Sequence, residues 1–233
     1  MEIHAFDLDR GLYHFLIEEI VADLHAHPAT ELILAHDGGF TICTQNHRFE
    51  NVRYALVKEN QPHAIEACVG KVDVIMCEAD VAEGLCEAMG ASMVEGILTT
   101  DDSAFENYAR ELLQEPRLKK QYKDHRVLTA VQYCEANLAD DLKLNDLAEH
   151  VHISASRFSH LFKGELGISF SSYLVWLRLK KAISGYLWQQ LNLTEACHHA
   201  GFHDSSHFTR HFKKFFGVKP SFPYNNSIVQ VSE

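Results

Sequence analysis

Two segments of the same layout follow one another between residues 142 and 220, and they constrain the fold of this 233-residue chain more than any other feature. In each segment, small and apolar residues at helical spacing are followed by a break and then by a second amphipathic stretch. The second stretches contain Phe158-x-x-x-Phe162 and Phe208-x-x-x-Phe212, which align at an offset of fifty residues. This layout predicts two helix-turn-helix units, not a regular solenoid.

The second helix of each unit is predicted to bury one face and to present the other to the major groove of DNA. Ser154 and Asp204 stand where these helices would begin, and their side chains can cap a helix. The small, polar and basic residues of the outward faces are the candidate DNA contacts: Ser156, Arg157, Ser159, His160, Lys163, Ser205, Ser206, His207, Thr209, Arg210 and Lys213. The alternative is that both faces are ordinary solvated helix surface.

Arg210 is the strongest candidate for base recognition, because a guanidinium group can make two parallel hydrogen bonds to guanine. Lys163 and Lys213 are better suited to phosphate contacts, which fix position without reading sequence. Residues 1–120 carry 9 Lys+Arg against 22 Asp+Glu, whereas residues 154–220 carry 9 against 3. A basic segment within an acidic chain can bind phosphates in a strongly salt-dependent way.

Residues 124–223 resemble the DNA-binding domain of the AraC/XylS family of bacterial transcription regulators. The matching residues are Leu147-Ala148, Ser154, Phe158-Ser159-x-Leu161-Phe162-Lys163, Gly167, Tyr173-Leu174, Arg178-Leu179-x-x-Ala182, Gly201-Phe202, Ser206-x-Phe208, Phe212-Lys213-Lys214-x-Phe216-Gly217 and Pro220. The resemblance implies two helix-turn-helix units joined by a long helix over about Ser169–Trp188. It also implies that base contacts fall on Ser156, Ser159, His160, Ser205, Ser206, His207, Thr209 and Arg210.

The chain departs from the family pattern at two places. Ala196-Cys197 stands where the family usually has isoleucine and alanine, and Pro223 or Tyr224 stands where the family has a closing arginine. These positions concern packing and the end of the domain more than DNA recognition.

The N-terminal part is predicted to be rich in β-structure. Short segments with many β-branched and aromatic residues predict strands over Tyr13–Val21, Glu31–Ala35, Phe40–Thr44, Arg53–Lys58 and Val72–Met76. Asp37-Gly38-Gly39 is typical of a hairpin turn. A helix is expected over Ala82–Met93, and Ser103–Glu106 has the form of a capping box that opens a second helix to Glu115. The apolar face of this second helix either packs on its own barrel or forms a dimer interface.

His25, His27, Glu31 and His63 form the second notable pattern. If the chain stays extended, residues 25, 27 and 31 point to the same side. Their spacing resembles the first metal motif of cupins, and His63 fits a second motif that is otherwise incomplete. Three histidines and one carboxylate suit Zn, Ni, Co, Fe or Mn. The alternatives are a ligand pocket without metal and a purely structural histidine cluster.

The remaining histidines and the six cysteines give weaker indications of function. His198, His199, His203, His207 and His211 crowd the second helix-turn-helix segment, where a zinc site is conceivable but exposed or phosphate-facing imidazoles are simpler. The cysteines show no paired short spacing, which favours reduced, buried thiols. No apolar run approaches the ~20 residues of a membrane span. The start lacks a basic signal-peptide segment, so a cytoplasmic location without a membrane partner is expected.

Together these patterns predict an α+β two-domain protein with an N-terminal cupin-like β-barrel, a helical extension and a C-terminal all-α double helix-turn-helix domain. The expected boundaries are 1–78 for the sensor barrel, 79–120 for a helical dimerisation or linker region, 121–225 for the DNA-binding domain and 226–233 for a tail. The expected partners are promoter DNA, a second copy of the chain and RNA polymerase.

The expected function is transcription regulation without enzymatic activity, controlled by a metal ion or small molecule bound in the barrel. One alternative is a dimeric regulator that needs no effector and whose barrel is structural. The other is a cupin metalloenzyme fused to a DNA-binding domain.

Overall fold

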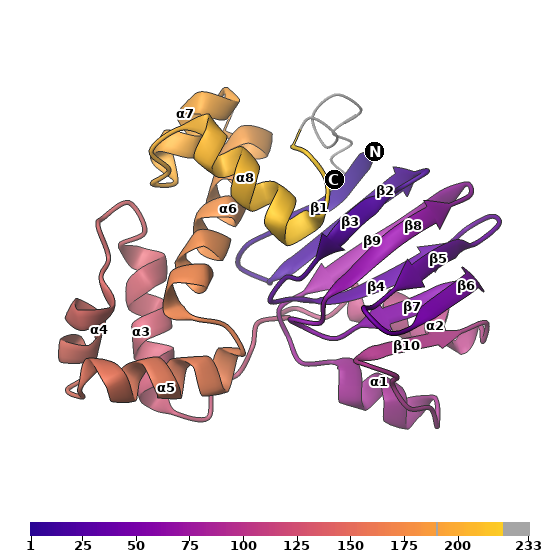
Figure 1. Ribbon diagram of the computed structural model, residues 1–233, viewed down its shortest axis with the longest axis horizontal. Helices are drawn as coiled ribbons and strands as arrows, with labels where there is room; N and C mark the ends of the chain where they lie inside the picture. Colours follow the sequence, from indigo (N-terminus) through magenta and orange to yellow (C-terminus); the bar gives the residue numbers. More distant parts are fainter. Residues whose placement is uncertain (190, 221–233) are drawn as a thin grey trace. The chain divides into compact units, whose positions relative to one another are not determined.

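The computed structural model describes residues 1–189 and 191–220. The chain divides into two compact units, with boundaries between Lys120 and Gln121 and between His211 and Phe212. The first unit contains the strands and two helices, and the second contains the remaining helices, of which α8 crosses the second boundary (Figure 1). The α+β fold class predicted from the sequence is confirmed.

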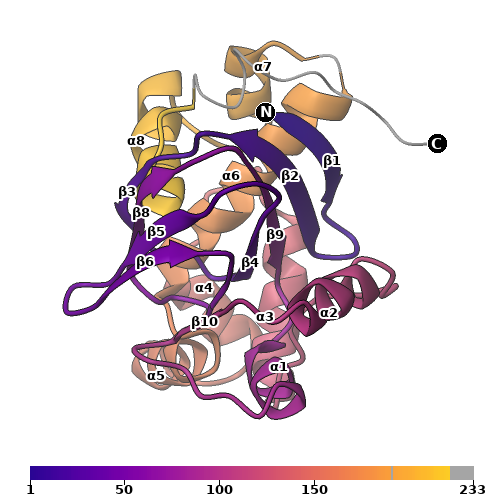
Figure 2. The same cartoon turned by 90° about the vertical axis from the view of Figure 1, so that its right-hand side faces the viewer.

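Two antiparallel sheets form the first unit. The larger sheet has the order β1 (Glu2–Asp7), β2 (Leu12–Glu18), β9 (Lys71–Cys77), β4 (Thr30–Ala35), β7 (Tyr54–Val57) and β10 (Ile97–Thr100). The smaller sheet has the order β3 (Ala22–His25), β8 (His63–Cys68), β5 (Phe40–Cys43) and β6 (Arg48–Val52), visible in Figure 2. Because β10 pairs with β7, the larger sheet continues beyond the barrel end expected at residue 78.

The five predicted strands are present as β2, β4, β5, β7 and β9. The turn at Asp37-Gly38 connects β4 to β5, but these strands belong to different sheets, so the predicted hairpin is wrong. Gly38 has φ +70°, and a Cβ atom there would lie 2.9 Å from the Val69 carbonyl oxygen of the neighbouring turn. Close packing of two turns explains why glycine is needed, although the chain changes sheets there.

Alternating side chains of the larger sheet pack against two helices. On β4, Leu32 and Leu34 belong to a buried cluster that includes residues of α1 (Ala82–Ala88) and α2 (Ala104–Leu112). Side chains alternate across a strand, so Glu31 and Ile33 point to the opposite face of this sheet. All six residues of β4 are buried, which indicates that both faces of the sheet are covered.

Both predicted helices of this unit differ in detail from the expectation. α1 ends at Ala88 and not at Met93, and Gly90 has φ +58°. Ser103 makes no side-chain capping bond, so the predicted capping box is wrong. The Asp102 carboxylate instead accepts a hydrogen bond from the Ala104 N–H over 2.9 Å. Glu106, the last residue of the predicted box, accepts a hydrogen bond from the Tyr54 hydroxyl.

The apolar face of α2 is buried within its own unit. Phe105, Ala109 and Leu112 belong to the core cluster and are at most 5% exposed. Phe105 stacks on Tyr54 of β7 with ring centroids 5.6 Å apart, and the Tyr54 hydroxyl donates to Glu106. This face therefore packs on the sheet, and the interpretation of the same face as an exposed dimer interface is wrong.

The helical part of the chain contains α3 (His125–Ala136), α4 (Leu144–His150), α5 (Ala155–Leu166), α6 (Phe170–Trp188), α7 (Leu193–His199) and α8 (Ser205–Phe216). The pairs α4–α5 and α7–α8 are the two predicted helix-turn-helix units, and α6 is the predicted long helix between them. The first helix, α3, was not expected. The family departure at Pro223 or Tyr224 and the tail 226–233 lie outside the described residues.

Capping side chains explain where the helices of these units begin. The Ser154 hydroxyl accepts the Arg157 N–H at 3.4 Å, and the Asp204 carboxylate accepts the His207 N–H at 2.7 Å. Gly167 ends α5 in the left-handed conformation at φ +73°, which is favourable for glycine. Both predicted caps are confirmed. Within the described residues, no helix is long and apolar enough to span a membrane.

Candidate DNA-binding surface and candidate metal centre

The second helix of each helix-turn-helix unit, α5 or α8, is the one predicted to enter the major groove, and we call it a reading helix. The first of them, α5, buries aromatic residues on one face and exposes its candidate DNA contacts on the other. Phe158 and Phe162 are fully buried and pack edge-on against Phe170, with ring centroids 6.1 and 5.7 Å away. All five predicted contacts on this helix are exposed, namely Ser156, Arg157, Ser159, His160 and Lys163. The aromatic contacts fix the orientation of α5, so its polar face is a rigid surface.

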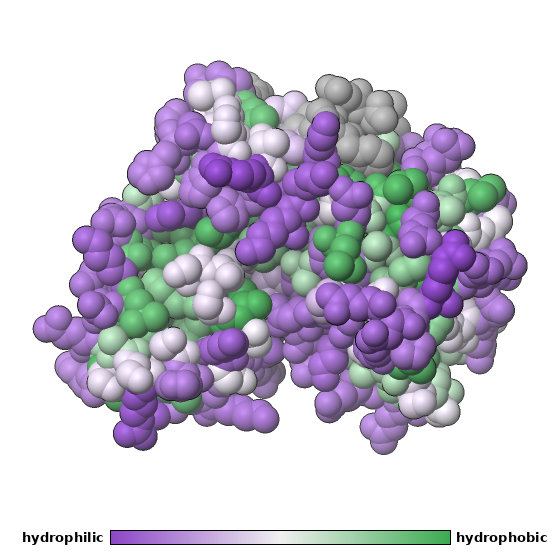
Figure 3. Space-filling model, in the orientation of Figure 1, coloured by the Kyte–Doolittle hydropathy of each residue, from purple (hydrophilic) through white to green (hydrophobic). Residues whose placement is uncertain are grey.

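The second reading helix, α8, repeats this arrangement. Phe208 and Phe212 are buried, while Ser205, Ser206, Thr209, Arg210 and Lys213 are exposed. Hydrophilic side chains cover much of the molecular face in Figure 3, with smaller apolar areas between them. Arg210, the strongest candidate for base recognition, is therefore accessible to a ligand.

His207 differs from the other candidates on α8 because its side chain is only partly exposed. Its ring packs edge-on against Phe202, with centroids 5.5 Å apart, and its Nε2 atom lies 2.9 Å from Nε2 of His211. This imidazole is thus already engaged by neighbouring side chains, unlike Arg210.

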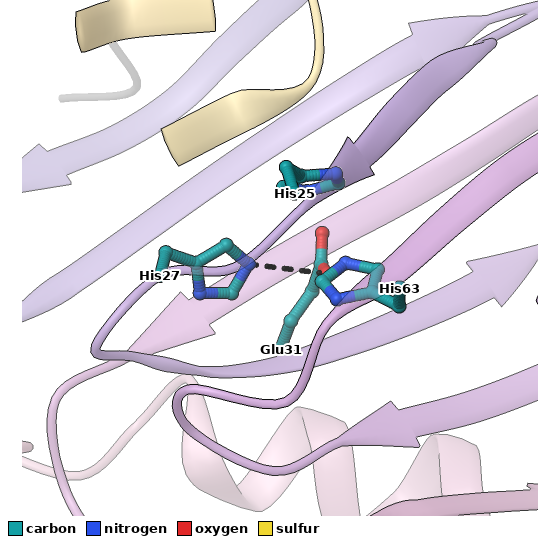
Figure 4. Close-up of side chains that lie close together, drawn as sticks. All are labelled: His25, His27, Glu31 and His63. Atoms are coloured by element: carbon teal, nitrogen blue, oxygen red, sulfur yellow. Dashed lines mark hydrogen bonds and ion pairs between the residues drawn. The ribbon is translucent and has the colours of Figure 1, made fainter. Parts of the chain in front are cut away.

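The structure brings together the four residues predicted as a metal site. One ligand atom from each of His25, His27, Glu31 and His63 lies within 4.8 Å of those of the others. We call this group the histidine–glutamate cluster. The Glu31 carboxylate points between the rings of His27 and His63 (Figure 4). All four residues are buried, with exposed fractions between 0% and 7%.

The four residues of the cluster come together because two sheets meet, and not because one extended strand carries them. β3 ends at His25 and β4 begins at Thr30, and these strands belong to different sheets. The predicted continuous extension from residue 25 to residue 31 is therefore wrong. His25 pairs in register with His63 on the smaller sheet, whereas Glu31 comes from the larger sheet. The cluster thus joins the two sheets.

A backbone carbonyl two residues away in sequence holds each imidazole of the cluster. Nδ1 of His25, His27 and His63 lies 2.8, 2.9 and 2.9 Å from the carbonyl oxygens of Asp23, Ala29 and Gln61. Since a carbonyl only accepts, each Nδ1 carries the proton. Sequence reasoning missed these acceptors because backbone carbonyls have no residue signature.

With Nδ1 bound to a carbonyl, Nε2 is the ring nitrogen left for other contacts, and those of His63 and His27 lie close to the Glu31 carboxylate. Oε2 of Glu31 lies 2.9 Å from Nε2 of His63 and 3.4 Å from Nε2 of His27. The His63 Nε2 atom is buried, and the Glu31 carboxylate is its partner. An imidazole that is held by a carbonyl through one ring nitrogen and faces a carboxylate through the other has the environment of a metal-ligating histidine once a cation replaces the proton between Nε2 and Oε2. The four residues therefore fit a divalent transition metal.

Burial and mutual interactions shift the pKa values within the cluster. Burial, followed by the charges of His63 and His27, lowers the pKa of His25 to about 3. Burial alone would raise the pKa of Glu31, but the neighbouring imidazoles His27 and His63 outweigh it and hold that pKa well below its usual value. Burial would lower the pKa of His63, but the hydrogen bond and charge of Glu31 outweigh it and raise that pKa. Without a metal the cluster therefore favours a neutral His25, an ionised Glu31 and a proton on His63, and a bound cation would have to displace that proton.

A separate polar group lies on the other side of the larger sheet, under α2. A cavity of about 280 Å³ is lined by His36, Asp73, Glu106 and Arg110, among others. The Asp73 carboxylate lies 2.7 Å from Nε2 of both His14 and His36. Sequence spacing gave no signal for this group, because its members come from β2, β9, α2 and the residue after β4.

Comparison with known proteins supports the interpretation of the helices. Residues 147–222 match the model of a helix-turn-helix domain family. The arabinose operon regulatory protein of Escherichia coli is 37% identical over 99 residues, which cover 42% of this chain and 34% of that protein. These matches show an AraC-type helix-turn-helix domain in residues 147–222. The regulatory protein PocR of Salmonella typhimurium is 32% identical to this chain over 97 residues, which cover 42% of this chain and 32% of PocR.

The chain spans about a third of the length of these curated relatives. A solved structure of ToxT from Vibrio cholerae matches 91% of this chain and 96% of its own, with a TM-score of 0.60 and 10% identity. At that identity the likeness concerns the fold alone. The AraC-type domain is therefore established by sequence, and the combination with a strand-rich N-terminal unit is established as a fold.

Proposed function

We propose that this chain regulates transcription by binding specific DNA sites through α5 and α8, under the control of an effector held by its first unit. This proposal rests on one observation: the AraC-type domain contains two reading helices, and each buries an aromatic face and exposes a polar face. A tandem pair can read two adjacent turns of the major groove. The DNA contacts predicted from the sequence remain part of this proposal.

The basic residues give this surface the charge that phosphate binding needs. Lys163 and Lys213 are exposed on the two reading helices, and the segment 154–220 has an excess of six basic over acidic residues. Phosphate contacts of this kind position a protein on DNA, while Arg210 is suited to reading guanine.

The proposed effector is a divalent transition metal of the Zn, Ni, Co, Fe or Mn class, held by the histidine–glutamate cluster. His25, His27 and His63 would supply Nε2 and Glu31 its carboxylate. A bound cation would link β3 and β8 of one sheet to β4 of the other through strong ligand bonds. An effector controls DNA binding only through different affinities for two conformations of the protein.

Organic effectors and catalysis are the competing interpretations. One solved structure of ToxT holds an unsaturated fatty acid, which is a property of that protein; the metal proposal rests on the four residues of this chain. The burial of all four residues favours binding of an ion over turnover of a substrate. Turnover of a small molecule by the metal-loaded chain would contradict this choice.

Elemental analysis tests the metal proposal. The full chain, purified without a histidine tag or chelator, should hold a transition metal ion at the cluster, and a His25→Ala/His27→Ala variant should hold one ion fewer. His47→Ala is the matched control, because His47 is half-exposed and pairs with Glu95 outside the cluster. Metal-free wild-type protein after reconstitution, or equal loss in the control, would contradict the site. Circular dichroism of each variant separates ligand loss from unfolding.

DNA binding tests the regulatory proposal separately. Fluorescence anisotropy with operator DNA selected from a random library should show specific binding by the wild-type chain, and stripping the metal should change the affinity. Equal affinity in both states would contradict metal control while leaving the metal site intact. No enrichment of any sequence would contradict the DNA-binding proposal itself.

A further inference from the structure

Two histidine side chains face each other one helical turn apart on α8. His207 and His211 are separated by four residues, which places them on the same helix face. Their Nε2 atoms lie 2.9 Å apart and their ring centroids 4.6 Å apart. We propose that His207 and His211 chelate a divalent transition cation of the nickel or copper type, at a site separate from the histidine–glutamate cluster.

The distance between the two nitrogen atoms favours particular metals. A metal–imidazole bond is about 2.0–2.1 Å long. Two such bonds to atoms 2.9 Å apart enclose an angle of about 90°, which is the angle between adjacent ligands in square-planar or octahedral coordination. A tetrahedral ion would need the nitrogen atoms roughly 3.4 Å apart. The pair therefore fits Ni²⁺ or Cu²⁺ better than Zn²⁺ without movement of the helix.

Neighbouring rings restrict His207. Phe202 packs edge-on against it, and the His203 ring stacks on it at a centroid distance of 6.3 Å. Both histidines are partly exposed, so water can complete the coordination of a bound ion. Because the helix already holds the two nitrogen atoms together, chelation costs little side-chain entropy.

Without a metal, the two Nε2 atoms share one hydrogen bond, and a bound cation can replace it. One neutral imidazole must donate its Nε2 proton to the other at 2.9 Å. Coordination replaces that proton with a cation, so both Nε2 atoms become ligands and the Nδ1 atoms carry the protons. The site lies beside Arg210 on the proposed DNA-binding face, although cation binding itself does not require the proposed function.

Nickel titration of the full chain tests this site. Isothermal calorimetry should give one Ni²⁺ equivalent fewer for His207→Ala and for His211→Ala than for the wild type. Since both residues hold one ion, the double variant should lose the same single equivalent and no more. His199→Ala is the matched control, because His199 is an exposed histidine at the end of α7, and it should leave the stoichiometry unchanged.

Three results would overturn the proposal: unchanged stoichiometry in His211→Ala, a loss of two equivalents in the double variant, or an equal loss in His199→Ala. Alanine favours helix, so the variants should keep the helical circular dichroism of the wild type. If His207→Ala disturbs packing against Phe202, His211→Ala alone decides the outcome. The comparison between these variants is independent of any nickel bound by the histidine–glutamate cluster, because that cluster is intact in all of them.

Discussion

At the scale of single residues, the two reading helices are unequal. On α5 the candidate base contacts are Ser156, Ser159 and His160, whereas α8 presents the exposed guanidinium of Arg210. We predict that Arg210→Ala weakens specific DNA binding more than His160→Ala does. A paired arginine–guanine contact contributes about 1–3 kcal/mol of discrimination, which corresponds to a loss of roughly 5-fold to 150-fold in affinity.

A competition assay between specific and random DNA measures this difference. Arg210→Lys is the control, because lysine keeps the charge but cannot make the same paired hydrogen bonds. It should retain binding to random DNA and lose much of the sequence preference. Equal or reversed losses in Arg210→Ala and His160→Ala would contradict the proposed asymmetry.

The histidine–glutamate cluster marks the limit of prediction from residue spacing. Residue types and the short spacing of His25, His27 and Glu31 were sufficient to name the cluster, and His63 was found from a partial motif. The path of the chain was not predictable from that spacing, because the residues between β3 and β4 leave one sheet and enter the other. The carbonyl contacts that orient the rings depend on this backbone path.

At the scale of secondary-structure elements, α2 is a packing element of the first unit. Phe105 is fully buried, stacks on Tyr54 and belongs to the core cluster. We predict that Phe105→Ala lowers the free energy of unfolding by ~3–5 kcal/mol, because a large buried side chain is replaced by a cavity. Urea denaturation followed by circular dichroism measures the change.

Asn107→Ala is the control on the same helix, since Asn107 is exposed, and it should change stability by less than about 0.5 kcal/mol. Sedimentation of both variants separates packing from association. A Phe105→Ala variant of wild-type stability that has lost a dimer would restore the dimer interpretation of this face.

The elements differ in how far their sequences predict them. Helix-turn-helix patterns are local, so apolar spacing together with the caps Ser154 and Asp204 predicted the presence of α5 and α8 and the residues at which they begin. Five strands were missed, because they are short or carry polar and exposed side chains and their positions depend on pairing with other strands: β1, β3, β6, β8 and β10. The capping box at Ser103 failed because Asp102 satisfies the first N–H of α2 instead.

At the scale of the whole molecule, the acidic and basic residues fall in different parts of the chain. Residues 1–120 have an excess of 13 acidic groups, and residues 154–220 have an excess of six basic groups. The acidic residues repel DNA at long range, whereas the basic residues attract phosphates at short range. Weak nonspecific binding follows from this arrangement, because the phosphate contacts must act against an unfavourable overall field. The salt dependence of binding is set by the number of phosphate contacts, since each contact releases counterions.

The salt dependence of DNA affinity tests this arrangement. We predict that Lys163→Ala reduces the slope of log K against log[salt] by about one and weakens binding to all sequences alike, because one phosphate contact is lost. Lys71→Ala, an exposed position on β9, should leave the slope unchanged. A slope that Lys163→Ala does not alter would show that α5 does not lie along the DNA backbone. An equal change from Lys71→Ala would mean that total charge, and not the face of the reading helix, determines the affinity.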